Sequence, residues 1–110
     1  MSHDPRVYLT DIVSAIRLIR QFVGQADFAA FSDDLKTQSA VLRQLEVIGE
    51  AVKRVPDSLR LQEPTVEWRK IAGPRDNLIH EYSDVDLEII WEVVCSKLDG
   101  LEQAAVRLLG

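Results

Sequence analysis

Apolar residues recur at three- and four-residue intervals along almost the whole chain, and this spacing restricts the possible folds more than any other sequence feature. It is typical of amphipathic helices, whereas half-buried strands alternate apolar and polar residues. No segment shows that alternation, so we expect an all-α fold. From Pro5 to Phe22 and just beyond, the stripe consists of Tyr8, Ile12, Ile16, Ile19 and Val23.

Signals for helix ends divide the chain into segments. Asp4 before Pro5 predicts the start of the first helix, because aspartate caps helices and proline suits the first helical position. Gly24 predicts its end. Residues 25–31 contain two phenylalanines and are expected to form a short turn over the core.

A second long helix is expected between the polar residues that follow this turn and the next proline. Each residue of the Ser-Asp-Asp run at 32–34 can cap its start. It should end near Val55, because Pro56 follows. Its predicted stripe is Leu35, Leu42, Leu45, Ile48, Gly49 and Val52.

A third helix is expected after a connection at residues 56–64, which has room for one helical turn. Thr65 is expected to cap this helix, and Gly73-Pro74 interrupts it. Proline in a helix interior removes a hydrogen bond and clashes with the preceding turn. We expect a kink there, or a break at which Pro74 opens a short new helix. The inward residues are predicted to be Trp68, Ile71 and Ala72.

The last helix is expected to begin within residues 83–86, which supply a turn and a cap, and to carry a heptad seam. Gly100 within the seam predicts a bend. Four long helical segments with short connections predict a four- to five-helix bundle in a single domain, residues 1–110. The seam consists of Leu87, Trp91, Val94, Leu98, Leu101, Ala105 and Leu108.

The first helix has apolar residues outside its main stripe. Either a second subunit covers them, or the stripe is broad and buried within one chain. The sequence leaves both alternatives open. These residues are Val7, Leu9, Val13, Leu18 and Phe22.

Composition and length indicate one globular unit. The chain has 110 residues, of which 46% are hydrophobic and 28% charged. The single cysteine, Cys95, cannot form an internal disulfide, so a reducing, cytoplasmic location is expected, with Cys95 as a small buried residue. No apolar run approaches the length of a membrane span, and the N-terminus lacks the pattern of a signal peptide.

The formal net charge of −5 argues against a protein coated in nucleic acid. Residues 83–102 carry six acidic residues against Lys97 alone, and we interpret them as a solvated acidic helix face. Cations elsewhere could follow an RNA backbone locally or simply be surface residues. They form three groups: Arg17 and Arg20; Lys53, Arg54 and Arg60; Arg69, Lys70 and Arg75.

Residue types exclude several familiar chemistries. One cysteine and two histidines cannot supply a zinc site, no Glu-x-x-His pair suggests di-iron, and the isolated glycines form no phosphate loop. We expect no metal and no cofactor. Glu46 and Glu50 are interpreted as ion-pair partners of the nearby cations Arg43, Lys53 and Arg54.

The segment from Gly73 to Tyr82 concentrates reactive groups: the guanidinium of Arg75, the imidazole of His80 and the phenol of Tyr82. Composition alone favours a capping or surface histidine. The run RDNLIHEY, however, matches the Arg-x4-6-His-x-Tyr pattern of the HEPN superfamily. The chain resembles its HepT-like branch, ribonuclease toxins paired with minimal nucleotidyltransferase (MNT) antitoxins. Further matching blocks are LEVIGEAVKRVP at 45–56, W-x-x-I-A-G-x-R at 68–75 and HEYSDVDLEIIWEVV at 80–94.

This resemblance implies a homodimer whose motif helices face each other across a cleft lined by Arg75 and His80 of both copies. The helical wheel gives a separate reason to expect a partner chain. Five residues at ~100° each place Arg75 and His80 about 140° apart, so they do not share one face of a straight helix. Either that helix is distorted, or residues from two copies converge on one phosphate.

The implied activity is metal-independent cleavage of RNA, such as tRNA or mRNA, through the 2′-hydroxyl. His80 would act as general base or acid, with an unperturbed pKa of ~6.5. Arg75 would bind the phosphate and stabilise the developing charge. Asp76 would orient one of these two, or be an ordinary surface carboxylate.

Tyr82 is implied as the residue that the cognate nucleotidyltransferase antitoxin modifies with AMP, although a packing role for this side chain stays open. The alternative to the nuclease is a non-catalytic, all-α nucleotide- or protein-binding subunit of a nucleotidyltransferase complex. Growth arrest that depends on Arg75 and His80 would favour the nuclease.

Overall fold

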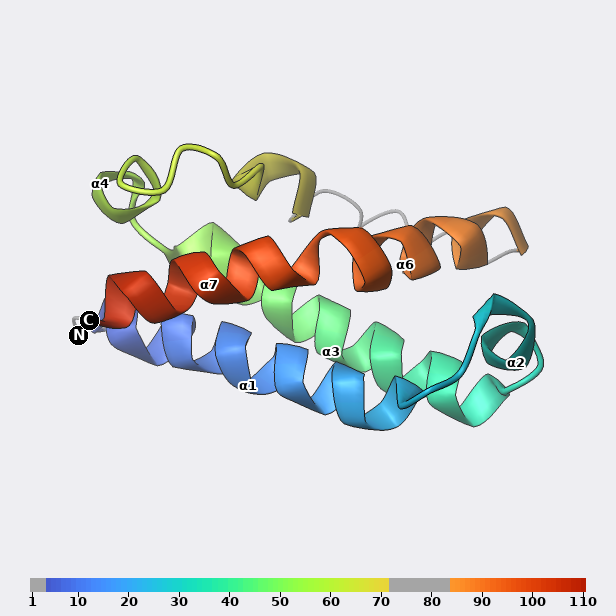
Figure 1. Cartoon of the computed structure of the whole chain (residues 1–110). Helices are drawn as coiled ribbons and strands as arrows, with labels where there is room; N and C mark the ends of the chain where they lie inside the picture. Colours follow the sequence, from blue (N-terminus) through green and yellow to red (C-terminus); the bar gives the residue numbers. More distant parts are fainter. Residues whose placement is uncertain (1–3, 72–83) are drawn as a thin grey trace.

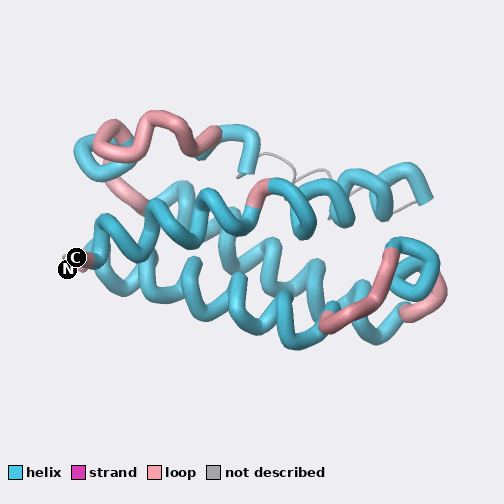
Figure 2. Tube along the Cα trace, in the orientation of Figure 1, coloured by secondary structure: helices cyan, strands magenta, loops and turns pink. Residues whose placement is uncertain are grey.

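All of the regular structure is helical in the part of the chain that the computed structural model describes, residues 4–71 and 84–110 (Figure 2). This confirms the predicted all-α class. Residues 68–71 also form a helical turn. The helices are α1 (Pro5–Val23), α2 (Phe28–Ser32), α3 (Leu35–Arg54), α4 (Asp57–Arg60), α6 (Asp84–Ser96) and α7 (Leu98–Leu109).

Three long rods form the body of the molecule: α1, α3 and the line made by α6 and α7 (Figure 1). Helix α1 packs mainly on α3 and α7. The short α2 closes one end, and the segment from α4 to residue 71 runs along the outside of α7. The start of α1 and the end of α7 lie together at the other end (Figure 1).

Helix α1 begins and ends at its predicted caps. Its last residue, Val23, lies one position beyond the predicted Phe22. The Asp4 carboxylate accepts a hydrogen bond from the amide of Arg6 at 2.9 Å, and Pro5 occupies the first helical position. Gly24 ends the helix with φ +56°, a backbone conformation that favours glycine.

Helix α3 is capped by Asp34, whose carboxylate accepts a hydrogen bond from the amide of Thr37 at 3.0 Å. It ends at Arg54, just before Pro56, as predicted. The connection contains one helical turn, α4, also as predicted. Leu35, however, is 71% exposed rather than buried, because it lies on the outer side of the first turn of α3.

The core is formed by the predicted stripes of α1, α3 and the α6–α7 line. The apolar residues of α1 outside its main stripe are expected from the sequence to be covered either within the chain or by a second subunit, and only some of them are covered within the chain. Leu9 and Val13 are buried within the chain, whereas Val7 stays 54% exposed. Leu18 and Phe22 are also exposed, so only part of this face is covered by the chain itself.

Two predictions about the third and fourth helices are wrong in detail. The turn at 68–71 starts after Glu67, whose carbonyl accepts from the amides of Lys70 and Ile71, so Thr65 is not its cap. The last helix is interrupted at Lys97, with φ −110°, and not at Gly100. Gly100 lies within α7 with open space around it, so packing does not require a bend there.

Cys95 is exposed, contrary to the prediction. It lies five residues after the fully buried Ile90, about 140° around the helix, and therefore on the outer side of α6. The predicted positions of Ala72, Gly73-Pro74 and Ser83 lie outside the described residues.

Candidate functional site

The residues predicted to carry the chemistry, Arg75, Asp76, His80 and Tyr82, all lie outside the described residues. What the structure shows is how the chain is held on each side of them. These two flanks are the turn at 68–71 and the first half of α6.

The flank before the motif is fixed by Trp68 and Ile71. Trp68 is 7% exposed, and its indole Nε1 donates a hydrogen bond to the carbonyl of Glu63 at 3.2 Å. Ile71 packs on the core, as the sequence predicts. A buried indole with a partner for its N–H holds this turn against the bundle.

The flank after the motif is fixed by α6. Leu87 and Ile90 are buried in the core. Trp91 lies against two aromatic rings of α2. Its ring centroid is 5.0 Å from that of Phe31 and 6.1 Å from that of Phe28. The two phenylalanines predicted to fold over the core therefore cover α6.

Ion pairs join the segment before the motif to α7. The Arg107 guanidinium lies 2.6 Å from a carboxylate oxygen of Glu63, and this contact holds the pKa of Glu63 below its ordinary value. Glu67 lies 2.6 Å from Lys70 and 3.5 Å from Lys97, and these lysines lower its pKa in the same way, Lys70 most strongly. Both flanks thus belong to one packed body.

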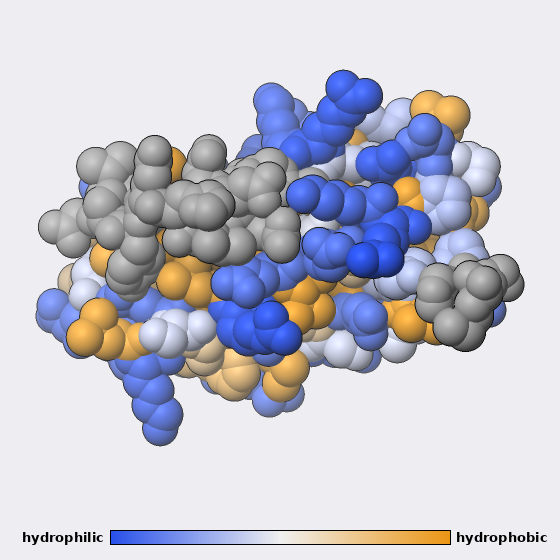
Figure 3. Space-filling model, turned by 180° about the vertical axis from the view of Figure 1, so that it is seen from behind, coloured by the Kyte–Doolittle hydropathy of each residue, from blue (hydrophilic) through white to orange (hydrophobic). Residues whose placement is uncertain are grey.

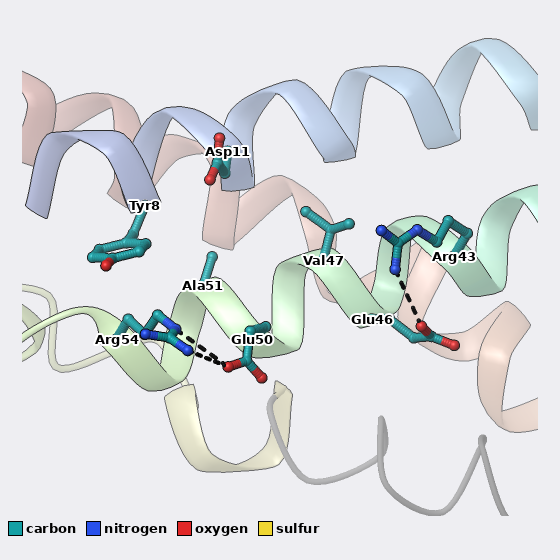
Figure 4. A pocket seen from close by; sticks show the side chains of 8 residues that line it. All are labelled: Tyr8, Asp11, Arg43, Glu46, Val47, Glu50, Ala51 and Arg54. Atoms are coloured by element: carbon teal, nitrogen blue, oxygen red, sulfur yellow. Dashed lines mark hydrogen bonds and ion pairs between the residues drawn. The ribbon is translucent and has the colours of Figure 1, made fainter. Parts of the chain in front are cut away.

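A groove of about 300 Å³ runs between α1 and α3 (Figure 4). Both of its glutamates are paired with arginines of α3: Glu46 lies 3.4 Å from Arg43, and Glu50 lies 3.0 Å from Arg54. The hydrogen bond that Arg54 donates to the Glu50 carboxylate is the main cause of the raised pKa of Arg54, whose guanidinium also lies 6.0 Å from the ring centre of Tyr8. This confirms the interpretation of Glu46 and Glu50 as ion-pair partners.

The first predicted cationic group serves the fold. Arg17 and Arg20 both pair with Glu102 of α7, and Arg20 also pairs with Asp99. The acidic segment is therefore not simply a solvated face, because part of it binds α1 to α7.

On the face seen in Figure 3, hydrophilic side chains form a band with hydrophobic residues showing between them.

A second hollow, of about 650 Å³, lies between α4 and the turn at 68–71. Sequence reasoning treated most of this stretch only as a connection. The available signal was the cations, because Arg60 of the second predicted group and Arg69 and Lys70 of the third all line the hollow. Among the described residues there is no cluster of side chains suited to a metal ion, and no helix long and apolar enough to cross a membrane.

Comparison with known proteins identifies the family. The sequence profile described as ribonuclease HepT-like matches residues 12–108, a range that includes the whole Arg75–Tyr82 motif. The chain belongs to the HepT-like ribonuclease family. This family is part of the HEPN superfamily, so the resemblance noted in the sequence is confirmed.

HepT-like relatives align over nearly the full length of this chain. It is 41% identical over 102 residues to "Probable ribonuclease HepT" of Thermococcus cleftensis, with 93% of each chain covered. It is 44% identical over 95 residues to "Putative RNase MJ0127" of Methanocaldococcus jannaschii, covering 86% of this chain and 78% of that one. No solved structure matches the chain significantly. HepT-like membership supports a ribonuclease of the HEPN type.

Proposed function

We propose that this protein is a metal-independent endoribonuclease toxin that acts in the cytoplasm as a homodimer and is neutralised by a nucleotidyltransferase antitoxin. The observation that carries the proposal is the Arg75-x4-His80-x-Tyr82 motif, inside a region matched by the HepT-like ribonuclease profile. Burial of Trp68 before the motif and of Leu87 after it supports the proposal, because catalytic groups act best when the elements that carry them are packed against a core.

In the proposed reaction, His80 of one copy takes the proton from the ribose 2′-hydroxyl. The 2′-oxygen attacks the adjacent phosphorus, and the 5′-oxygen leaves with a proton from His80 of the other copy. Arg75 binds two phosphate oxygens and stabilises the charge of the transition state, while Asp76 orients Arg75 or His80. The products are a 2′,3′-cyclic phosphate and a 5′-hydroxyl.

The decisive experiment is RNA digestion in the presence of EDTA. We expect the wild-type protein to cut, and the rate to fall about 10²–10⁴-fold in His80→Ala, the loss typical of removing a general acid–base group. His3→Ala is the matched control, since His3 is the other histidine of the chain and lies outside the motif. Cleavage only with added divalent metal, or equal rates for the two variants, would contradict the mechanism.

Neutralisation is proposed to occur by transfer of AMP from ATP to the phenol oxygen of Tyr82, with loss of the phenol proton and release of pyrophosphate. The added phosphate and nucleotide place negative charge and bulk beside Arg75, where they compete with the RNA phosphate. After co-expression with the cognate antitoxin, mass spectrometry should show a gain of AMP that Tyr82→Phe abolishes. Tyr8→Phe removes the other tyrosine and should leave the adduct in place. An adduct that persists in Tyr82→Phe would exclude Tyr82 as the acceptor.

A further inference from the structure

The hollow between α4 and the turn at 68–71 combines an apolar wall with a cationic rim. Its apolar wall includes Leu61, which is 76% exposed, together with Pro64 and Val66. All three line the same hollow, so Leu61 belongs to an apolar surface and is not an isolated exposed residue. Apolar side chains can pack against the face of a nucleobase.

Positive charge exceeds negative charge around this hollow. Arg60, Arg69 and Lys70 line it, against Asp57 and Glu67. Glu67 is already engaged by two lysines, Lys70 and Lys97. Arg69 is exposed and has no ion pair with any other residue in the described part of the chain, so its guanidinium is available to an anion.

Arg60 also has a hydrogen-bond donor without an acceptor. It pairs with Asp57 through Nη2, while its Nε–H is buried and has no hydrogen-bond acceptor. A buried donor without an acceptor is unfavourable. Because Arg60 lines the hollow, an anion bound there is a candidate acceptor for this donor. The α1–α3 groove differs, because its two arginines are both matched by carboxylates.

We propose that this hollow is a subsite for single-stranded RNA, in which Arg69 and Arg60 bind a backbone phosphate and the wall at Leu61 receives the adjacent base. The inference rests on the proposed function, for which it names a second point of substrate contact. Arg75 follows Arg69 by six positions. Because each position adds at most about 3.3–3.6 Å, their Cα atoms are no more than about 20 Å apart whatever path the chain takes. A few nucleotides of extended RNA cover that span.

The test measures RNA affinity separately from cleavage. In a His80→Ala background with EDTA, the affinity for a fluorescent single-stranded RNA is measured by anisotropy at several salt concentrations. We expect Arg69→Ala to weaken binding roughly five- to tenfold and to reduce the slope of log affinity against log salt by about 0.7, the loss of one phosphate contact. Leu61→Ser should weaken binding without changing the slope.

Arg43→Ala is the matched control. It removes the same charge from an exposed arginine that lines the α1–α3 groove rather than this hollow. We expect its RNA affinity to stay unchanged. If Arg43→Ala and Arg69→Ala lose affinity equally, or neither does, or the His80→Ala protein binds no RNA, the subsite does not exist.

Two further outcomes separate this inference from the proposed function. RNA that binds through Arg69 but is never cut by the wild-type protein would remove the nuclease and retain the subsite. Cleavage with the same KM in wild type and Arg69→Ala would retain the nuclease and remove the subsite. Loss of antitoxin binding in Arg69→Ala, with RNA affinity intact, would assign the hollow to an acidic protein partner instead.

Discussion

Gln38 illustrates how a single residue fixes the local geometry of this bundle. Its side chain is 1% exposed, and it is the one buried polar side chain among the described residues. Its Nε2 donates to the carbonyls of Phe31 at 2.8 Å and Ser32 at 3.0 Å, at the C-terminus of α2. The Phe31 carbonyl also accepts from the amide of Asp34 at 3.2 Å, and the side chain of Gln38 supplies an additional donor to both carbonyls where α2 ends.

We therefore expect Gln38→Leu to destabilise the protein by about 1–3 kcal/mol, because buried carbonyls lose a hydrogen-bond donor. The free energy of unfolding is measured by urea denaturation followed by circular dichroism. Gln103→Leu makes the same substitution at an exposed position of α7 and should change the stability little. Equal stability of the two variants would show that the buried amide contributes nothing.

Glu102 makes stability depend on pH. The hydrogen bond from Arg20 is the main cause of the lowered pKa of Glu102, and Arg17 adds to it. A carboxylate whose pKa is lower in the folded state stabilises the protein above its unfolded pKa, about 4.3, and loses this contribution as pH falls through the folded value.

Glu102→Gln should therefore lower stability by about 1 kcal/mol at pH 7 and have progressively less effect as the pH falls below about 4.5. Thermal unfolding across this pH range measures the difference. Glu92→Gln is the control, since Glu92 is exposed on α6 and has no ion pair within the described part of the chain. A deficit in Glu102→Gln that persists undiminished at low pH would exclude the ionised pair as its cause.

At the scale of elements, burial of the Phe31 ring holds α2 in place. It has only five residues, and a helix of that length is not stable by itself. Phe31 is 1% exposed and packs against Trp91 of α6, so burial of this ring holds α2 over the bundle. Asp27 caps the helix by accepting a hydrogen bond from the amide of Ala30 at 2.9 Å.

Phe31→Ala is expected to cost about 3–5 kcal/mol, because it removes a fully buried ring and leaves a cavity. Trp91 fluorescence during denaturation should also change in this variant, since the indole loses its neighbour. Phe22→Ala is the comparison: that ring is 38% exposed on α1, and its loss should cost less than about 1 kcal/mol. A similar cost for both variants would exclude Phe31 as the anchor of α2.

The elements could be predicted from sequence wherever their signals are local. Asp4, Pro5 and Gly24 mark the ends of α1 because caps and φ preferences act within a few residues. The exposure of Leu35 and Cys95 and the interruption at Lys97 depend instead on which neighbours pack against each turn, and the apolar period does not carry that information. For the candidate site, the motif predicts which residues act, whereas their arrangement depends on contacts that a single sequence does not specify.

At the scale of the whole molecule, the proposed site needs two copies of the chain. The exposed apolar residues Val7, Leu18 and Phe22 on α1 remain uncovered by this copy. We expect sedimentation to give the mass of a dimer. A strictly monomeric protein with full nuclease activity would contradict the composite site.

Mixing two inactive variants tests whether the copies share the site. Arg75→Ala and His80→Ala proteins, unfolded together and refolded, form some mixed dimers in which the arginine of one copy faces the histidine of the other. The mixed dimer keeps one arginine and one histidine in the shared cleft, whereas each single variant lacks all of one type. We therefore expect the mixture to cleave RNA faster than either variant alone and more slowly than wild type, because one of the two proposed histidine proton transfers is lost. Activity that stays at the level of the single variants would place the arginine and histidine of each site in the same chain.

The start of α1 lies beside the end of α7, and the guanidinium of Arg6 donates to the carbonyl of Leu109 at 2.6 Å. A short linker could therefore join these two helices, and new ends could be opened in the exposed link at Gly24 and Gln25. Such a circular permutant would keep every helix pairing while changing their order along the chain.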